Sequence, residues 1–154
     1  MAEAERIIAE NRQARHNYHL LQFWEAGLVL TGSEVKSLRA GQVQLKDSFA
    51  LVRGGQAQLV NCHISPYRNA GYAGHEPERS RRLLLHKAEI DKLEGQTREK
   101  GLTLIPVRLY FKRGRVKCEL ALAKGKQQYD KRETERRREA EREARAAMKA
   151  HGRR

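Results

Sequence analysis

The chain has 154 residues, with 32 Lys and Arg against 19 Asp and Glu, so its formal net charge is +13. This length fits about one domain, and such an excess of positive charge favours a polyanion as the partner. The sequence has no apolar run near the roughly 20 residues that span a bilayer, and residues 1–10 lack the apolar core of a signal peptide. We therefore expect a cytoplasmic protein that binds nucleic acid. A membrane surface, or charge that serves solubility alone, is the alternative.

The first part of the chain predicts two strands. Residues 2–10 are compatible with a short helix that has few apolar anchors, and the polar, basic residues 11–15 follow. Tyr18–Trp24 is rich in β-forming side chains and predicts the first strand. Gly27–Leu30 is a short apolar run that predicts a second, buried strand, joined to the first at residues 25–27.

A capping box marks the start of the next helix. Thr31 can accept a hydrogen bond from the backbone N–H of Glu34, and the Glu34 side chain can reach back to the N–H of Thr31. Val35 and Leu38 form the apolar face of this short helix, and Gly41 supplies the left-handed residue that ends it.

A β-hairpin is predicted after this helix. Val43–Arg53 alternates as a strand does, with Phe49 and Leu51 expected on its buried face. Gly54-Gly55 is a hairpin turn, and Gln56–Ile64 is the returning strand.

The second half of the chain predicts a loop, a helix and a further hairpin. Residues 67–82 form a long loop, and residues 86–100 have the apolar spacing of a helix. Residues 102–111 and 116–123 alternate as strands on either side of a turn at Arg113-Gly114.

These elements predict a mainly β protein with helices, in which residues 1–124 form a small OB-like β-barrel of about six strands with two or three packed helices. Residues 125–154 contain no Val, Ile, Leu, Phe or Trp. They cannot bury enough apolar surface to offset the entropy of ordering, yet they are rich in good helix formers. We expect a basic C-terminal tail that is disordered when free and helical on a partner.

Residues suited to catalysis or metal binding are scattered. None of the six histidines has the i, i+4 spacing of metal ligands, and Cys62 and Cys118 belong to no Cys-x-x-Cys pair. Glu25, Glu34 and Asp47 could form the Mg²⁺ site of a nuclease, but capping and solvated roles account for them better. We predict two buried, reduced thiols, and we predict no metal, no cofactor and no enzymatic activity.

Basic residues lie at the expected strand ends and helix faces. They are Arg12, Arg15, Lys36, Arg39, Lys117, Lys124 and Lys126. Contacts from such groups to phosphates supply affinity without sequence choice. Each residue alone is equally consistent with a solvated surface charge, whereas the set favours RNA binding. Glu25 adds a carboxylate that can accept hydrogen bonds from unpaired bases, with the capping of a turn as the alternative role.

Four blocks of sequence, in order, resemble one bacterial family. They are EAGLVLTGSEVKSLRAG (residues 25–41), NRQARH (11–16), RLLLHK (82–87), and KGK (124–126) leading to DKR (130–132). Over residues 11–132 the chain resembles small protein B, the family of bacterial tmRNA-binding (SsrA-binding) proteins. Four long blocks in the family's order are far more specific than one short motif.

The resemblance implies a particular function. Members of this family bind the tRNA-like domain of tmRNA and, with elongation factor Tu and GTP, deliver it to stalled ribosomes for trans-translation. Their tail occupies the decoding centre and the empty mRNA channel, next to small-subunit rRNA. From its helix propensity and charge we expect the tail of this chain to become helical there. We expect this chain to bind and deliver tmRNA in the same way, as a monomer.

The resemblance and the basic residues named above together give two sets of predicted site residues. For tmRNA recognition the resemblance itself points to Asn11, Glu25, Leu84 and Lys117. The tmRNA-binding set is Asn11, Arg12, Arg15, His16, Glu25, Lys36, Leu84, Lys117 and Lys124. The set for the decoding centre and mRNA channel is Lys126, Tyr129, Asp130, Lys131 and Arg132. Leu84 is expected to stack on a loop base or, alternatively, to pack in the core. A general ribosome-associated RNA-binding protein or RNA chaperone is the alternative function, and an RNA-processing enzyme has the least support.

Overall fold

The structure is a computed structural model that describes residues 5–66, 75–99, 101–126 and 128–151. Its strands are β1 (Arg6–Glu10), β2 (Tyr18–Leu28), β3 (Val43–Gln44), β4 (Phe49–Arg53), β5 (Gln56–Val60), β6 (His63–Ile64), β7 (Arg81–Leu84), β8 (Thr103–Lys112) and β9 (Arg115–Gly125). Its helices are α1 (Arg12–Asn17), α2 (Gly32–Arg39), α3 (Lys87–Glu99) and α4 (Gln128–His151).

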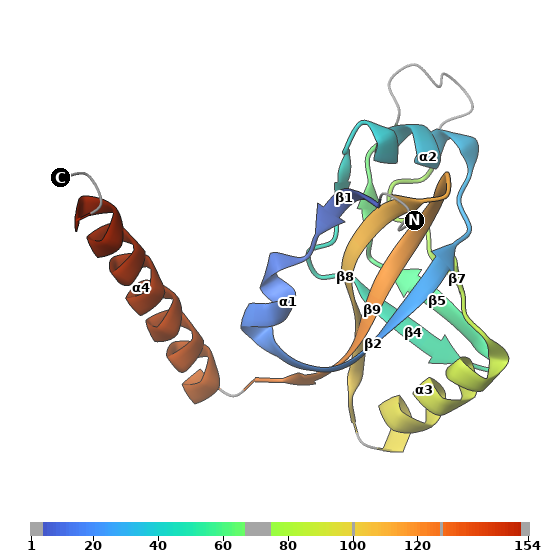
Figure 1. Ribbon diagram of the computed structural model, residues 1–154. Helices are drawn as coiled ribbons and strands as arrows, with labels where there is room; N and C mark the ends of the chain where they lie inside the picture. The colour runs from blue at the N-terminus through green and yellow to red at the C-terminus, as the bar shows by residue number, and fades with distance from the viewer. Residues whose placement is uncertain (1–4, 67–74, 100, 127, 152–154) are drawn as a thin grey trace.

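The main sheet closes on itself as a barrel. Its strand order is β1-β8-β4-β5-β7-β2-β9, and β9 pairs again with β8, so the six strands from β8 to β9 form a ring. The β1 strand lies outside the ring and pairs with the far part of β8, while β3 and β6 form a separate two-stranded sheet. Figure 1 shows the barrel with α4 extending away from it. The predicted small OB-like barrel with helices packed on it is confirmed.

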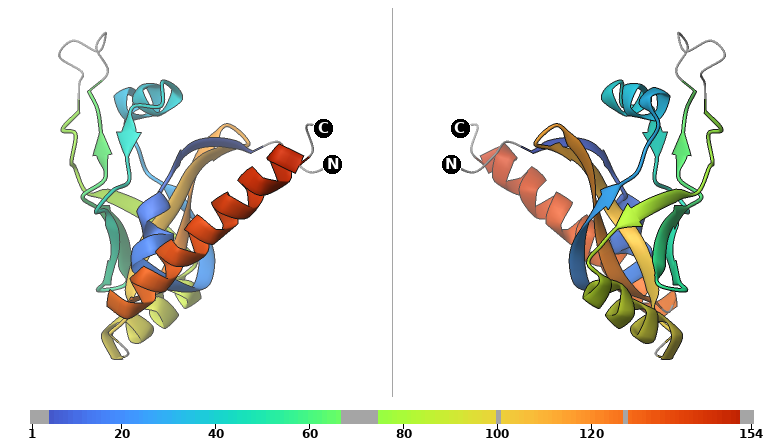
Figure 2. Two further views of the ribbon diagram at one scale, coloured as in Figure 1. Left: turned by 90° about the vertical axis from the view of Figure 1, so that its left-hand side faces the viewer. Right: turned by 90° about the vertical axis from the view of Figure 1, so that its right-hand side faces the viewer.

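Two helices cover opposite ends of the barrel, and both contribute to its core. The α2 helix lies at one end and α3 at the other, as the views in Figure 2 show. Leu38 of α2 and Ile90 and Leu93 of α3 are buried with the inward side chains of the strands. Each such side chain contributes about 1.5–3 kcal/mol on leaving water. The core therefore fixes the helices as well as the strands.

Both cysteines are buried free thiols, as the sequence predicted. Burial raises the pKa of Cys62 to about 11, and burial also raises the pKa of Cys118. Both groups therefore stay protonated and unreactive at neutral pH.

Local sequence signals predicted α2 and the hairpin turns correctly. Thr31 Oγ1 accepts from the N–H of Glu34, and Glu34 Oε1 accepts from the N–H of Thr31 at 2.9 Å, so the capping box is present. Gly41 follows the helix with a φ of 71°. Gly54 and Gly55, with φ values of 62° and 76°, form the turn between β4 and β5.

The N-terminal prediction was wrong in three respects. Residues 6–10 form the strand β1 instead of a helix, because their pairing with β8 outweighs local propensity. Residues 12–17 form the helix α1, where we expected only a polar segment. The two predicted strands before Thr31 are one continuous strand, β2, because residues 25–27 pair with β9 without interruption.

The strand predicted over Val43–Arg53 is divided. Asp47 has a φ of 62°, which interrupts the extended backbone between β3 and β4. Across this break the facing changes, so Ala50 and Val52 are buried while Leu51 is exposed. The prediction was therefore wrong for Leu51, whereas Phe49 is half-buried against the smaller of the two hydrophobic clusters.

Asn61 interrupts the returning strand in the same way, with a φ of 61° between β5 and β6. The loop predicted over residues 67–82 ends earlier than expected. Residues 67–74 lie outside the described part of the chain, and Arg81 already begins β7.

A buried ion-pair cluster joins α2 to β7. The side chains of Glu34 and Arg81 are both fully buried, and Arg81 Nε donates to Glu34 Oε2 at 2.6 Å. Arg79 donates to Glu34 Oε1, and Arg81 also donates to the backbone carbonyl oxygens of Cys62 and Pro77. Burial by itself would raise the pKa of Glu34, but the hydrogen bonds from Arg79, the Thr31 N–H and Arg81 outweigh it and hold the pKa at about 2.

Removing this carboxylate should destabilise the barrel. We expect Glu34→Gln to lower the free energy of unfolding by about 3–5 kcal/mol, because it leaves Arg81 as a buried cation without its counter-ion. The ion pair stabilises the fold fully above the ordinary Glu pKa, and this stabilisation is lost as the pH falls toward the folded-state pKa of about 2. The difference between the parent protein and Glu34→Gln should therefore shrink across that interval in urea unfolding.

The matched control is Glu76→Gln, because the Glu76 side chain is exposed in the same region of the chain. Equal stabilities for Glu34→Gln and Glu76→Gln would contradict the structural role of the buried pair.

Candidate nucleic-acid interface

Strand pairing places residues of four strands in one row, at the end of which Tyr110 is buried. Gly27 of β2 pairs with Leu84 of β7 on one side and with Lys117 of β9 on the other, and Lys117 pairs with Tyr110 of β8. Paired residues in antiparallel strands present their side chains on the same face. Residues far apart in the chain therefore meet in one line.

Leu84 lies outside the core. Its side chain is 52% exposed, whereas its neighbour Leu83 is 1% exposed and belongs to the core. A Cβ atom added to Gly27 would lie 3.2 Å from the Cβ of Leu84, so the glycine lets Leu84 lie close over β2. Of the two roles considered for Leu84, core packing is wrong, and an exposed apolar contact fits.

Glu25 lies two residues before Gly27 on β2, and the side chains of Tyr110 and Lys112 hold its carboxylate. Tyr110 donates its hydroxyl to Glu25 Oε2, and Lys112 Nζ lies 3.2 Å from the same oxygen. The Tyr110 hydrogen bond is the main cause that lowers the pKa of Glu25; Lys112 and Lys117 act in the same direction, and partial burial opposes them. Burial and the bond to Glu25 raise the pKa of Tyr110, so its hydroxyl remains a donor.

Glu25 is the acidic member of a cationic hollow. The hollow has a volume of about 480 Å³ and is lined by Glu25, Lys112, Arg113, Arg115 and Lys117. The turn between β8 and β9, where Arg113 and Gly114 have φ values of 54° and 72°, brings these cations together. Sequence reasoning identified Glu25 and Lys117 but missed the others, although the dense basic run on both sides of Gly114 was a usable signal.

The α1 helix carries the second group of predicted residues. Asn11 precedes the helix and donates from Nδ2 to the Pro106 carbonyl oxygen at 3.0 Å, while its backbone N–H donates to the Val107 carbonyl oxygen at 2.7 Å. These bonds fix α1 at the irregularity in β8 between Pro106 and Arg108. Asn11 therefore positions the helix.

Arg12 and Arg15 are exposed on α1 beside a second hollow. This hollow has a volume of about 550 Å³, and it is lined by Glu10, Asn11, Arg12, Arg15, Val107, Arg108, Glu119 and Arg138. His16, on the same helix, bonds to Glu135 of α4 through Nε2 at 2.9 Å. His16 thus contacts the C-terminal helix directly.

Strand pairing connects the two hollows. Glu25 pairs with Glu119, and Glu119 pairs with Arg108, whose guanidinium lies 4.5 Å from the ring centroid of Tyr110. Arg108 is also 3.4 Å from both Glu119 and Glu5. The hollow around Glu25 and the hollow beside α1 therefore border one continuous face. Tyr110 and Arg108 join the two hollows, and the sequence did not predict either of them as a site residue.

Two predicted RNA-binding residues lie elsewhere. Lys36 is exposed on α2, at the end of the barrel. Lys124 pairs with His19 and lines a separate hollow with Leu21 and Leu122. The structure does not bring these two lysines together with Glu25.

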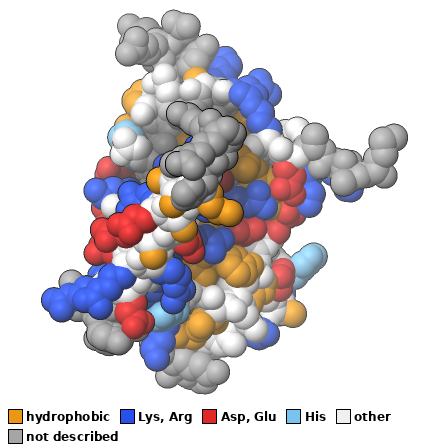
Figure 3. Space-filling model, turned by 60° about the vertical axis from the view of Figure 1, so that its left-hand side comes forward, with side chains coloured by type: hydrophobic (Ala, Val, Ile, Leu, Met, Phe, Trp, Pro, Cys, Tyr) orange, Lys and Arg blue, Asp and Glu red, His pale blue; other side chains and the backbone are white. Residues whose placement is uncertain are grey.

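The residues predicted for the ribosome follow β9. Lys126 Nζ donates to the Arg15 carbonyl oxygen at 2.9 Å and to Thr134 Oγ1 at 2.7 Å, so Lys126 joins α1 to α4. Lys131 is half-buried and Arg132 is exposed on α4. The side chains of Tyr129 and Asp130 lie outside the described residues. On the face of the molecule drawn in Figure 3, basic and acidic side chains are interspersed with apolar ones.

Neither a metal centre nor a membrane span emerges from the part of the chain that the structure describes. No three of its His, Cys, Asp and Glu side chains are grouped so that they could hold a metal ion. In that same part, every helix is too short or too polar to cross a bilayer.

Fold and site together define an OB-like barrel protein with a cationic outer face. Residues 8–150 match the model of the SmpB protein family. The chain belongs to this family.

Its relatives extend over nearly the whole chain. It is 60% identical over 146 residues to the SsrA-binding protein of Desulforudis audaxviator, covering 94% of this chain and 95% of the relative. It is 56% identical over 150 residues to the SsrA-binding protein of Trichodesmium erythraeum, and this match covers 97% of this chain and 96% of the relative. A solved structure described as "tmRNA-SmpB: a journey to the center of the bacterial ribosome" is 48% identical, with a TM-score of 0.67, and the match covers 84% of this chain and 94% of that one.

The contact between Tyr110 and Glu25 gives a direct test of the site geometry. We expect Tyr110→Phe to raise the pKa of Glu25, because this change removes the hydrogen bond that chiefly stabilises its carboxylate. An NMR titration of the Glu25 carboxyl carbon measures the shift. Tyr18→Phe is the control, and an unchanged Glu25 titration in Tyr110→Phe would refute the contact.

Proposed function

We propose that this protein binds the tRNA-like domain of tmRNA and delivers it to stalled ribosomes for trans-translation. Membership of the SmpB family supports this, as do relatives called SsrA-binding protein and a similar solved structure described with tmRNA and the ribosome. We propose that it acts as a monomer, without catalysis of its own, and that elongation factor Tu with GTP joins it through alanylated tmRNA.

The observation that carries the proposal is a hydrogen-bond acceptor held inside a cationic hollow. Lys112, Arg113, Arg115 and Lys117 surround Glu25, and such cations attract phosphates of any RNA. The carboxylate repels phosphates, so it weakens indiscriminate binding. It also accepts hydrogen bonds, and base edges in an unpaired loop offer donors. A site of this composition favours a folded RNA that presents an unpaired base.

We propose different parts for the neighbouring residues. Tyr110 and Lys112 restrict the Glu25 side chain, mainly through Oε2, which leaves Oε1 the better placed oxygen for a base. Leu84 offers an exposed apolar surface near that point, on which a base can pack. Arg12 and Arg15 extend the phosphate-binding surface along α1. Lys36 and Lys124 would contact the RNA only where it passes beyond this face.

The chain divides functionally into a barrel, residues 1–124, and a tail, residues 125–154. The tail carries 11 basic and 6 acidic residues, a net charge of +5, which suits a channel lined by rRNA phosphates. We propose that Tyr129 stacks on a base at the decoding centre, that Lys126, Lys131 and Arg132 contact phosphates, and that Asp130 lies among them. In free solution we expect the tail to be largely coil, because most described side chains of α4 are exposed.

Selectivity between RNAs tests this function. Charge alone gives salt-sensitive and indiscriminate binding, so tmRNA should outcompete elongator tRNA at a physiological ionic strength of about 0.15 M. A competition assay with labelled tmRNA measures the ratio. Equal competition would support the alternative, a general RNA-binding protein or RNA chaperone.

The proposed role of Glu25 predicts a change in RNA affinity opposite to the one that electrostatics alone predicts. Removing an anion from a cationic protein should strengthen RNA binding by Coulomb attraction. We expect Glu25→Ala instead to weaken tmRNA binding by about 1–3 kcal/mol, because an accepted hydrogen bond is lost. Glu76→Ala, with the same charge change at an exposed position, is the control. Glu25 is not a contact if a folded Glu25→Ala protein binds tmRNA at least as tightly as the parent.

Truncation separates the tail from the barrel. A protein ending after Gln128 should keep its tmRNA affinity and lose the tagging of nascent chains on stalled ribosomes. A tmRNA binding isotherm and a peptide-tagging assay on the same truncated protein measure both. Normal tagging would rule out the decoding-centre role, and lost tmRNA binding would place the tail in the RNA-binding site.

A further inference from the structure

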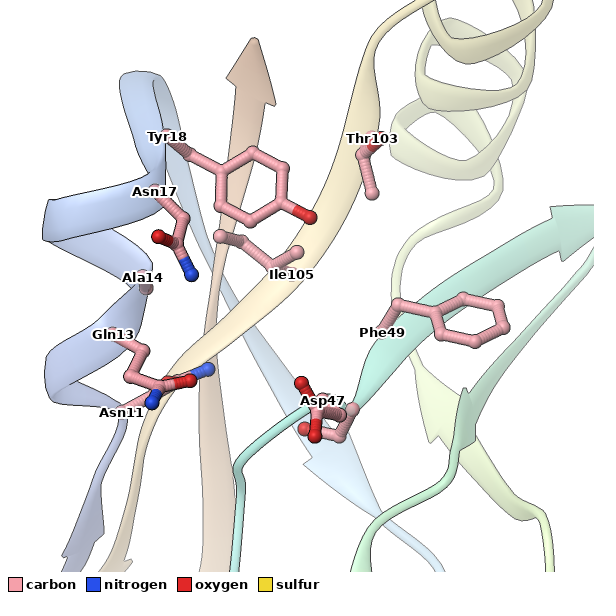
Figure 4. Close-up of a pocket in the computed structure, with 10 residues that line it drawn as sticks. Asn11, Gln13, Ala14, Asn17, Tyr18, Asp47, Phe49, Thr103 and Ile105 are labelled. Atoms are coloured by element: carbon pink, nitrogen blue, oxygen red, sulfur yellow. The ribbon is translucent and has the colours of Figure 1, made fainter. Parts of the chain in front are cut away.

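A small cavity lies on the other side of α1 from the arginine-lined hollow. Its volume is about 220 Å³, and it opens between α1, the start of β2, the segment before β4, and β8. Figure 4 shows its lining residues. They are Asn11, Gln13, Ala14, Asn17, Tyr18, Asp47, Ser48, Phe49, Thr103 and Ile105. None of them except Asn11 was assigned to a site above.

The cavity has apolar side chains at its floor and two aromatic side chains at its edge. Ala14 and Ile105 are 2% exposed and belong to the smaller of the two hydrophobic clusters. Tyr18 and Phe49 are half-buried and pack against the same cluster. A flat aromatic ligand of one or two fused rings fits a space of this size and can stack on such side chains.

Polar groups approach the cavity from two sides. Gln13 and Asn17 extend into it from α1, and Asp47 faces them from the segment before β4 (Figure 4). His16 Nδ1 lies 3.0 Å from Asn17 Oδ1, which leaves the Asn17 amide N–H groups as donors toward the cavity. Asp47 has a φ of 62°, in the left-handed region that Asp adopts more readily than most residues, and it lines the cavity opposite the α1 side chains.

We infer that this cavity binds a single unpaired guanine base of an RNA, an inference that rests on the RNA-binding function proposed above. A carboxylate needs donors, and guanine alone among the four bases presents two adjacent donors, N1–H and N2–H, on one edge. The Gln13 and Asn17 amides supply donors for the guanine O6 and N7 acceptors. Adenine places an acceptor beside its single donor group, so Asp47 would repel part of its edge.

The surroundings suit the backbone that carries such a base. Arg12 and Arg15 are exposed on α1, and Lys46 is exposed next to Asp47. These cations can hold the phosphates on either side of the base, while Asp47 selects the base itself. A free guanine nucleotide has the same edge but lacks the flanking phosphates.

Short oligonucleotides test the inference. Three labelled pentamers are compared: UUGUU, the same pentamer with inosine at the centre, and UUAUU. Fluorescence anisotropy measures the affinity of the full-length protein for each. We expect UUGUU to bind at least about tenfold more tightly than UUAUU, with inosine between them because it lacks the N2 donor. Asp47→Asn should remove this preference. Asp91→Asn, an identical charge change at an exposed position on α3, should preserve it.

Asn tolerates the left-handed backbone of position 47, so Asp47→Asn is expected to fold. Shifts of the Tyr18, Thr103 and Ile105 amide signals on addition of UUGUU would place the base in the cavity. Equal binding of the three pentamers, or a preference that survives in Asp47→Asn, would overturn the inference. If tmRNA still outcompetes tRNA in that case, the proposed function stands without the cavity. A guanine preference without tmRNA selectivity would support the cavity and reject the proposed function.

Discussion

The buried pair of Glu34 and Arg81 is the interaction on which much of this structure depends. Two charges without solvent exposure are tolerated only if every oxygen and N–H group is satisfied, and here α2, β7 and backbone carbonyls supply the partners. The pair therefore fixes the start of α2 relative to β7. The β7 strand in turn pairs with β2, and this pairing places Leu84 over Gly27, two residues from Glu25.

Cross-strand register then converts a barrel into a surface with defined chemistry. The row from Leu84 through Gly27 and Lys117 to Tyr110 is drawn from four strands, and no two of these residues are neighbours in sequence. Tyr110 donates its hydroxyl to the Glu25 carboxylate, which lines one hollow together with four cationic side chains. An acceptor that repels anions and side chains that attract them thus lie side by side on one face.

The errors of sequence interpretation share a physical origin. Residues 6–10 have too few local signals to specify a helix, and the free edge of β8 decided that they form a strand. Nothing in the sequence distinguishes Arg81 from the arginines beside it. Its burial arises from contacts with Glu34 and Cys62, which precede it by 47 and 19 positions in the chain. Tyr110 was overlooked for a similar reason, since its partner Glu25 is 85 residues earlier in the chain.

By itself the sequence determined whatever depends on near neighbours: the capping box at Thr31, the glycine turns, the alternation of β8 and β9, and the low apolar content of the tail. These features follow from hydrogen bonds and side-chain periodicity within a few residues. Four ordered sequence blocks also sufficed to indicate the family. The tertiary structure alone decided which strands pair, which arginine is buried, and which side chains meet around Glu25. Those outcomes require barrel closure, because only closure brings distant segments into register and removes selected charges from water.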